Sequence, residues 1–216
     1  GSSETLPGTG DGVPQSLFVC AFTTRFTWAK AILGAGSFVL GAARLGNDRV
    51  VLLLGTSGDP IIFSAGAPDE FIYPNQPGQT VYATYSTSGT FLGVNDLITI
   101  SPAVEFFGYS IQSAKDGGVY IIGGIDTDIT VAPGTPSETV LHASDNLWGY
   151  AVLKVTPAGD LAYAVLARVT SPAHSINIDS VRSTSDGGMV MSGDFLGTIQ
   201  FGVGNPGEPT ISNSLA

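Results

Sequence analysis

The sequence predicts an all-β fold built from repeated units of four strands, and three observations carry this prediction. One hydrophobic pattern occurs three times at spacings of 68 and 70 residues (116 − 48 and 186 − 116), at Asp48–Gly55, Asp116–Gly123 and Asp186–Gly193. The apolar runs are rich in Val, Ile, Leu, Tyr and Phe, which favour strands. The chain also holds 29 Gly and 13 Pro without a collagen period, which suits short strands joined by turns. A repeat of this length decides the architecture before any local feature is considered.

The second copy of the pattern shows how one unit is organised. Strand candidates follow one another at Gly108–Ala114, Val119–Ile125, Tyr150–Val155 and Leu161–Val169. Asp-Gly-Gly separates the first two and Pro-Ala-Gly-Asp the last two, and both patterns are typical of hairpins because Gly accepts a positive φ. A longer excursion between the second and third strands contains the short run Ile129–Val131. Four antiparallel strands per repeated unit predict the blade of a β-propeller.

The other two copies depart from this unit in different ways. In the first copy, Asn47–Arg49 replaces the glycines, and residues 65–79 are expected to form an inserted loop. The third copy lacks its last two strands downstream, and their counterparts stand at the start of the chain as Phe18–Phe22 and Thr27–Ala31. We therefore predict a β-propeller of three four-stranded blades, half or part of a ring, whose third blade is completed by the N-terminal strands. The expected blades are residues 37–100, residues 105–170, and residues 174–204 together with 17–32.

Three blades do not close a ring, because propellers typically have four to eight. Two chains could pair into a six-bladed ring, each completing the other's broken blade, or the chain could belong to a longer propeller. Strand donation that fails to close would instead propagate into a filament. The expected partner is thus another copy of the chain or the remainder of a longer propeller. The residues expected in the assembly strands are Phe18, Val19, Phe22, Trp28, Met189, Met191 and Phe195.

The third copy and the start of the chain carry motifs that resemble a known family. Ser185–Phe195 and Ile199–Gly202, continued by Phe18–Phe22 and Thr27–Lys30, are similar to the repeats of bacterial β-propeller proteins, the SBBP-like repeats of secreted or surface proteins. In those repeats a Gly-x-Phe and a Phe-Gly step precede Asp-x-Phe-Val-Ala-Lys and Leu-Trp-Ala-Lys strands. The resemblance covers most of residues 17–204 and implies a propeller fold. It implies little about activity, because this fold hosts binding, scaffolding and catalysis alike.

The charge balance excludes two classes of partner. The net charge is −10 with only 8 Lys and Arg, so the basic footprint of a nucleic-acid-binding protein is missing and anionic membrane surfaces are disfavoured. No apolar run reaches the roughly 18 residues that span a bilayer, so we expect no membrane insertion. Charged residues make up only 12% of the chain, which favours an extracellular or cell-surface protein. The single cysteine, Cys20, rules out an internal disulfide framework and is interpreted as a small buried hydrophobe.

Carboxylates near the turns are candidate metal ligands. Asp126 and Asp128 follow the second strand of the second copy, and Asp59, Asp69 and Glu70 lie at the corresponding place in the first. Oxygen clusters can hold Ca²⁺, which takes six to eight oxygens, but no Asp-x-Asp-x-Asp loop with a closing Glu is present. We therefore expect solvated loop carboxylates, no cofactor and no metal, with Ca²⁺ as the less favoured alternative.

The sequence offers no recognisable catalytic pattern. A carboxylate pair for glycoside hydrolysis is defined by its separation in space, which a sequence does not give. His142 and His174 have no second His or Cys at ligand spacing, so neither a zinc site nor a Cys–His nucleophile pair is expected. Gly-x-Ser-x-Gly is not present. We predict that the chain is not an enzyme.

Aromatic residues are the candidates for ligand contact. An exposed ring can stack on a sugar, whereas Trp28 and Trp148, at strand positions, are expected to pack between blades. Phe71 and Tyr73 lie in the expected loop and are better candidates for an exposed surface. The predicted ligand-binding set is Phe71 and Tyr73, with Trp148 as the less favoured third member because its expected position is between blades.

The predicted function follows from the open sheet edge of the third copy. Such an edge aggregates unless another strand pairs with it. We therefore predict a non-catalytic structural or interaction module, at the cell surface or outside the cell, that assembles by strand complementation into a larger propeller or polymer. The alternative is a glycan- or peptide-binding propeller module, and a glycosidase-type enzyme is a distant third.

Overall fold

The computed structural model shows an all-β protein whose strands form three hydrogen-bonded sheets, one of them curled into a half-barrel. The structure describes residues 16–22, 26–34, 38–55, 59–74, 80–100, 107–143, 149–170, 175–202 and 209–213. Within these ranges the chain forms strands and no helix. The described part of the chain therefore contains no helix that could cross a membrane.

Two complete four-stranded units lie at the centre of the molecule. Their strand orders are β3-β4-β7-β8 in the first unit and β9-β10-β13-β14 in the second, and every neighbouring pair is antiparallel. The first to fourth strands of each unit are therefore neighbours in that order, as the sequence predicts. The strands of the first unit are Phe38–Leu45, Arg49–Gly55, Thr80–Ser86 and Phe91–Ile100; those of the second are Phe107–Ser113, Val119–Ile125, Gly149–Val155 and Leu161–Val169.

Four described hairpins close with one type of turn, three of them in these units and one at Thr184–Gly188. Each turn spans five residues. The N–H of the first residue donates to the carbonyl of the fifth, and the N–H of the fourth residue donates to the carbonyl of the first. That fourth residue is Gly with a positive φ in every case, which a side chain would disfavour. The turns are Ser86–Thr90, Ala114–Gly118, Thr156–Asp160 and Thr184–Gly188.

The first turn of the first unit corrects the repeat register. Leu45 pairs with Arg49, and this five-residue closure corresponds to the one between Ala114 and Gly118. The two copies are therefore 69 residues apart (114 − 45), one more than the sequence alignment on Asp48 gives. The positive φ falls on Gly46 in this turn rather than on the fourth residue, so the turn has a different shape and the Asp residues do not correspond.

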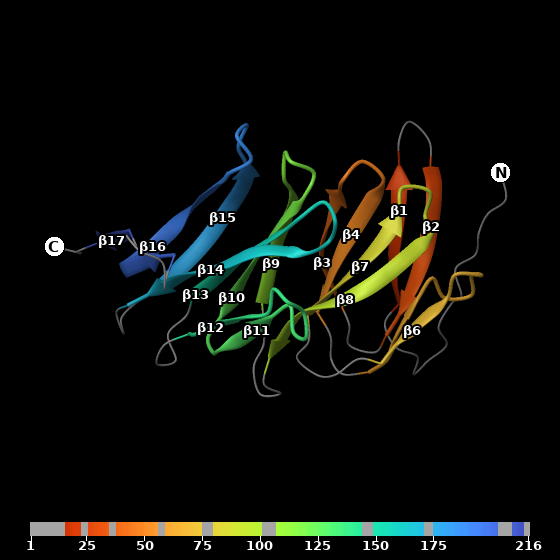
Figure 1. Ribbon diagram of the computed structural model, residues 1–216, viewed down its shortest axis with the longest axis horizontal. Helices are drawn as coiled ribbons and strands as arrows, with labels where there is room; N and C mark the ends of the chain where they lie inside the picture. Colours follow the sequence, from red (N-terminus) through yellow and green to blue (C-terminus); the bar gives the residue numbers. More distant parts are fainter. Residues whose placement is uncertain are drawn as a thin grey trace.

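A half-unit stands at each end of the array (Figure 1). The N-terminal half-unit consists of β1 (Ser16–Phe22) and β2 (Phe26–Leu33), which pair with each other. The third unit consists of β15 (Ser175–Ser183) and the first part of β16 (Met189–Phe201). The sheets follow one another along the long axis, so the two half-units lie at opposite ends.

Within one chain, the described N-terminal strands pair with each other and not with the third unit, so the blade completion predicted from the sequence is not made by the chain's own N-terminal strands among the described residues. Among the described residues, β1 pairs with β2, and β16 pairs with β14, β15 and β17 (Thr210–Asn213). The physical reason is that β2 packs on the first unit, where Ile32 is fully buried with Leu52 and Leu54. Within the described part of the chain, the third unit therefore consists of two strands, β15 and the first part of β16.

The excursions between the second and third strands are short hairpins that join successive units. β5 (Ile61–Phe63) and β6 (Phe71–Tyr73) form one, and β11 (Ile129–Val131) and β12 (Thr139–Leu141) form another. Each hairpin pairs with the last strand of the preceding unit: β5 with β2, β11 with β8, and the end of β16 with β14. The described part of the expected inserted loop, residues 65–74, is therefore not an insertion but the counterpart of residues in the β11–β12 hairpin of the second unit.

The hydrophobic core lies in layers between consecutive sheets. Leu52 and Leu54 of β4 belong to the layer shared with β2, whereas Leu53 belongs to the layer shared with the second unit. Ile121 of β10 faces the first unit and Ile122 the third. Alternate side chains of one strand point to opposite faces, so both faces of the central units are covered. This burial on two sides explains why these strands are continuous apolar runs.

Candidate assembly site

The first part of β16 is a sheet edge with a partner on one side only. Residues Met189–Asp194 pair with β15, and no other described strand pairs with them. The Thr184 N–H donates to the Gly188 carbonyl, which makes these two a hydrogen-bonded pair. Hydrogen-bonded and non-hydrogen-bonded pairs alternate along antiparallel strands, so the main-chain groups of Met189 and Met191 point away from β15. They are oriented for an additional strand.

Burial along β16 differs from burial along its counterparts. Every residue of β10 is buried, and β4 is buried from Val51 to Gly55. In β16 only Ile199 is buried, and Val190 is 56% exposed where its counterpart Tyr120 is 2% exposed. The strand lacks the neighbour that its counterparts have, and its apolar Met and Val side chains are left partly in water.

The strand β1 presents the opposite edge. It pairs with β2 along its whole length, and no further described strand pairs with it. By order and hairpin connection, β1 and β2 correspond to β13 and β14, the third and fourth strands of the second unit. Within the described residues, one end of the array therefore has a second strand without a third, and the other end has a third strand without a second.

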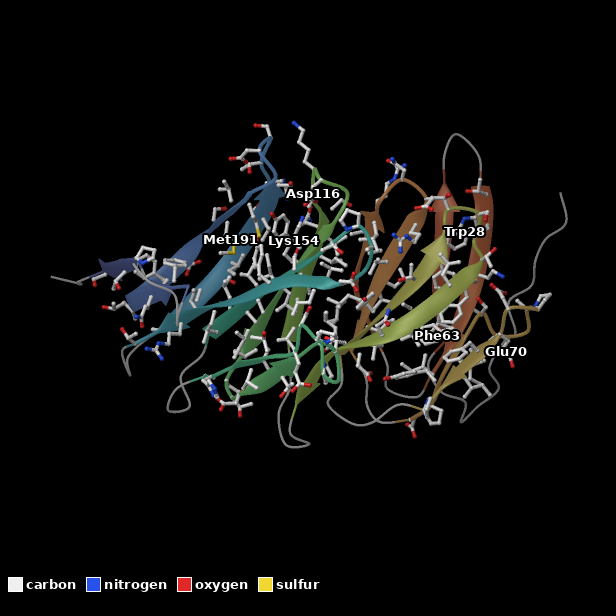
Figure 2. The ribbon with its side chains drawn as sticks, in the orientation of Figure 1. Trp28, Phe63, Glu70, Asp116, Lys154 and Met191 are labelled. Atoms are coloured by element: carbon white, nitrogen blue, oxygen red, sulfur yellow. The ribbon has the colours of Figure 1, made fainter. Side chains whose placement is uncertain are left out.

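The predicted assembly residues lie on these elements. Phe18, Val19 and Phe22 are in β1, where the structure describes the backbone but not the side chains. Met189 and Met191 pack against the layer between the second and third units, and Phe195 is half-buried in the same strand. Figure 2 shows the Met191 side chain in the body of the array, toward the second unit.

Trp28 packs between successive sheets, as its strand position suggests. Its ring stacks on Tyr85 with centroids 6.0 Å apart, and its indole N–H donates to the Thr87 carbonyl at 2.9 Å. A Cβ on Gly89 would lie 2.7 Å from this ring, so the glycine makes room for it. Trp28 therefore fixes the N-terminal half-unit to the first unit.

The ligand candidates Phe71 and Tyr73 lie on β6, at the edge of the first sheet. Phe71 is 43% exposed and stacks on Phe91, whose ring in turn stacks on buried Phe63 at 5.1 Å. The Tyr73 hydroxyl donates to Asp96, and burial together with this carboxylate raises the pKa of Tyr73. Trp148 and His174 lie outside the described residues. Phe71 and Tyr73 thus lie on the same short strand, and each contacts a residue of β8, Phe91 and Asp96 respectively.

Asp69 ties three elements together beside these aromatic rings. Its carboxylate accepts from the Lys30 ammonium at 2.8 Å and from the Phe91 N–H at 2.7 Å. Partial burial would raise the pKa of Asp69, but the hydrogen bonds from Lys30 and Phe91 hold it below its ordinary value. This carboxylate, a candidate Ca²⁺ ligand in the sequence, is engaged in holding β2, β8 and the β5–β6 turn.

Asp116 and Lys154 form a similar link within the second unit. Lys154 is buried, with its ammonium 2.7 Å from the Asp116 carboxylate and 4.3 Å from the centre of the Tyr120 ring (Figure 2). The hydrogen bond from Lys154, opposed by partial burial and supported by the Gly118 N–H, lowers the pKa of Asp116. The pair joins the turn between the first two strands to the third strand. In the third unit, the counterpart Asp186 accepts hydrogen bonds from the Thr184 hydroxyl and the Gly188 N–H, within its own turn.

The remaining carboxylates do not assemble into a metal centre in the described part of the chain. No group of three or more His, Cys, Asp or Glu side chains there is placed to hold a metal ion. Asp128 pairs with His142 at 2.8 Å, and Glu70 accepts from the Gly66 N–H at 2.7 Å. Glu138 accepts from the Gly134 N–H in the same way, so these glutamates close the hairpin turns.

A cavity of about 230 Å³ lies between the first and second units. The polar groups around it connect the two units: Arg49 donates to the Pro157 and Ala158 carbonyls, and the Tyr82 hydroxyl donates to the Gly159 carbonyl. Burial raises the pKa of Tyr82, and the nearby Asp160 carboxylate adds to this effect. These hydrogen bonds hold the first and second units together around the cavity.

Comparisons with protein-family models, curated proteins and solved structures give no match to this chain. The resemblance to bacterial propeller repeats therefore depends on its short motifs, and the candidate site depends on the geometry of the two strand edges.

Proposed function

We propose that this protein is a non-catalytic structural or interaction module, at the cell surface or outside the cell, that assembles by accepting a strand at the open edge of β16. The observation that carries the proposal is the difference in burial between β16 and its counterparts β4 and β10. The two complete units show what the third unit lacks, which is a third strand against the edge at Met189–Asp194. A larger propeller, closed or polymeric, is the assembly that such addition would extend.

The main chain supplies the affinity in this mode of association. An added strand gains backbone hydrogen bonds, and alternate side chains fix its register. The outward face of β16 carries Ser192 and Asp194. The counterparts of Ser192 in the first and second units are the buried residues Leu53 and Ile122, and those of Asp194 are the buried glycines Gly55 and Gly124. This face is too polar for apolar sheet packing of the kind seen between the central units. The edge is therefore the better attachment point.

Net charge should regulate the assembly. At −10 per chain, copies repel one another at low ionic strength, and salt screens this repulsion. Assembly through strand pairing should therefore strengthen as salt rises from about 20 mM to about 200 mM, because the Debye length shortens. The extracellular setting is supported by the low proportion of charged residues, 12%.

The experiment is to block the edge with Met191→Pro and to measure the size distribution by sedimentation velocity. Proline removes the N–H that would bond an incoming strand and leaves the hydrogen-bonding groups of Val190, which face β15, in place. Val190→Thr is the matched control, because it changes an exposed side chain on the same strand and keeps the edge. Circular dichroism checks that both variants keep their strand content.

The proposal expects oligomers for the native chain and Val190→Thr, and monomers for Met191→Pro. If Met191→Pro unfolds, Ser192→Lys is the second variant, since Ser192 is exposed on the same strand and lysine on an edge also opposes strand addition. A native chain that stays monomeric at all concentrations and salt levels, or oligomers that survive both edge substitutions, would overturn the proposal.

A further inference from the structure

We infer that the strand accepted by β16 is β1 of a second copy of this chain, in a single register that places Met191 opposite Cys20. This inference rests on the assembly proposed above and adds the identity and alignment of the partner. It follows from two structural landmarks, one on each strand, that fix their positions within the repeat.

The landmark on β16 is the turn that precedes it. Thr184–Gly188 closes with the same hydrogen bonds as Ala114–Gly118, so Met189 is the counterpart of Val119 and Met191 the counterpart of Ile121. Both methionines pack on the preceding unit, as Val119 and Ile121 do. The position of β16 in the repeat is therefore fixed without reference to any partner.

The landmark on β1 is a β-bulge. The pairing of the third and fourth strands shifts between Thr84 and Tyr85 in the first unit, and between Lys154 and Val155 in the second. The β1–β2 pairing shifts in the same way between Ala21 and Phe22. A bulge is a positional feature of a strand pair. Phe22 is therefore the counterpart of Tyr85 and Val155.

The two landmarks together give the register. In the second unit Val119 pairs with Val155, and Ile121 pairs with Leu153. Transferred to the open edges, Met189 lies opposite Phe22 of the second copy and Met191 opposite its Cys20. Residues that pair across antiparallel strands share a face of the sheet. The incoming copy thus supplies the third strand, and β2 follows it as the fourth.

The strand roles also explain why a second copy fits this edge. The edge of β16 requires a third strand whose own outer side is open, and β1 is such a strand, since it pairs only with β2 among the described residues. The contact is heterologous, because the two surfaces that meet are different. It repeats at the other end of each copy, so it gives a ring if the rotation closes and a filament if it does not.

The test is a disulfide between the two register positions. Cys20 is the only cysteine in the chain, so Met191→Cys provides a second thiol with no competing site. The positions correspond to a hydrogen-bonded pair, with Cα atoms about 5.5 Å apart, which is within the range a disulfide spans. Oxidised glutathione accepts the two electrons released when the bond forms. The products are read on a non-reducing gel, with the reduced variant checked by circular dichroism.

Two matched controls separate register from proximity. Val190→Cys is more exposed than position 191 but lies on the opposite face of the strand, and Met189→Cys is displaced by two residues along the same face. Neither pairs with Cys20 in the inferred register. We expect at least about ten times faster cross-linking for Met191→Cys, because a diagonal neighbour about 7–8 Å away exceeds disulfide reach.

A second design protects the test against a loss of packing at position 191. In the triple variant Cys20→Ala, Ala21→Cys and Val190→Cys, the thiols occupy the next pair of the same register. That pair is non-hydrogen-bonded, with Cα atoms about 4.5 Å apart, and should cross-link as readily. Covalent dimers alone indicate a closed two-chain ring, and a ladder of multiples indicates a filament.

The outcomes distinguish this inference from the proposed function. Cross-linking confined to Met191→Cys and the triple variant supports the register. Equal cross-linking of all single variants, or none in chains that still assemble through the β16 edge, overturns the inference and leaves the proposed function standing. Loss of assembly in the native chain overturns both.

Discussion

For the ion pair between Lys154 and Asp116, we predict that neutralising the more exposed residue, Asp116, lowers the unfolding free energy more than replacing the buried Lys154. The Lys154 side chain is 6% exposed and the Asp116 side chain 49% exposed. Asp116→Asn keeps an oxygen for the Gly118 N–H but leaves a buried ammonium without its counter-ion. Removing one partner of a fully buried pair costs about 3–5 kcal/mol. Because water reaches Asp116, we expect a smaller loss, about 2 kcal/mol of unfolding free energy.

Lys154→Met should cost less. It leaves a carboxylate that water can solvate, and the Met side chain replaces the buried stem of the lysine. The variant loses the attraction between Lys154 and the half-exposed Asp116 and the contact of the ammonium with the Tyr120 ring, which together lower the unfolding free energy by about 1 kcal/mol or less. The double variant should match Lys154→Met alone, since no buried charge remains. Urea unfolding at one fixed protein concentration measures all three. A larger cost for Lys154→Met than for Asp116→Asn would refute this reasoning.

Three further predictions concern the contacts between sheets. Hydrogen bonds hold the pKa of Asp69 below its ordinary value, so the ionised carboxylate stabilises the fold fully above about pH 3.8, and this contribution is lost as the pH falls through the lowered pKa. The unfolding free energy of Asp69→Asn should therefore change less with pH below about pH 4 than that of the native chain. Phe63→Ala should destabilise by about 3–5 kcal/mol in urea unfolding, whereas Phe71→Ala, at the exposed end of the same stack, should cost about 1 kcal/mol; equal costs would contradict the layered core. Gly118→Ala places a Cβ 2.3 Å from the Val155 carbonyl oxygen and should lower the melting temperature through a loss of about 1–3 kcal/mol; an unchanged melting temperature would contradict this packing.

Much of the strand order could be predicted from the sequence because the signals are local. The apolar runs of β10 and β14 begin and end where the sequence analysis placed them, and Gly at the fourth position of each turn marks the hairpins. The all-β class follows from the same signals. The error of one residue at Asp48 arose because the first turn places its positive φ on Gly46 instead of on the fourth residue.

The short hairpins between units were missed, although the sequence contains a signal for them. Gly66–Glu70 and Gly134–Glu138 share the pattern Gly-x-Pro-x-Glu, and the same pattern recurs at Gly204–Glu208. In the two described copies the Glu carboxylate accepts from the Gly N–H and closes the turn. Strands of three residues carry too little periodicity to be found by hydrophobicity alone. An alignment on this motif would have removed the supposed insertion.

The contacts of the candidate site are less accessible to sequence reasoning. The stack of Trp28 on Tyr85 and the bond between Lys30 and Asp69 join residues far apart in the chain, and they depend on how successive sheets face one another. The open edge, by contrast, could be anticipated, because it follows from the order of strands. What the structure adds is the orientation of the main-chain groups at Met189 and Met191.

Amide hydrogen exchange along β16 is the most direct test of the central claim that this edge pairs in solution. The Val190 N–H faces β15, so its protection reports the folded third unit at any protein concentration. The N–H groups of Met189 and Met191 face away from β15 and are protected only if another strand is added. If the edge pairs with another strand, all three N–H groups are protected in concentrated, salt-screened protein, and dilution removes the protection at Met189 and Met191 alone. Fast exchange at these two positions under every condition, with Val190 protected, would contradict this pairing.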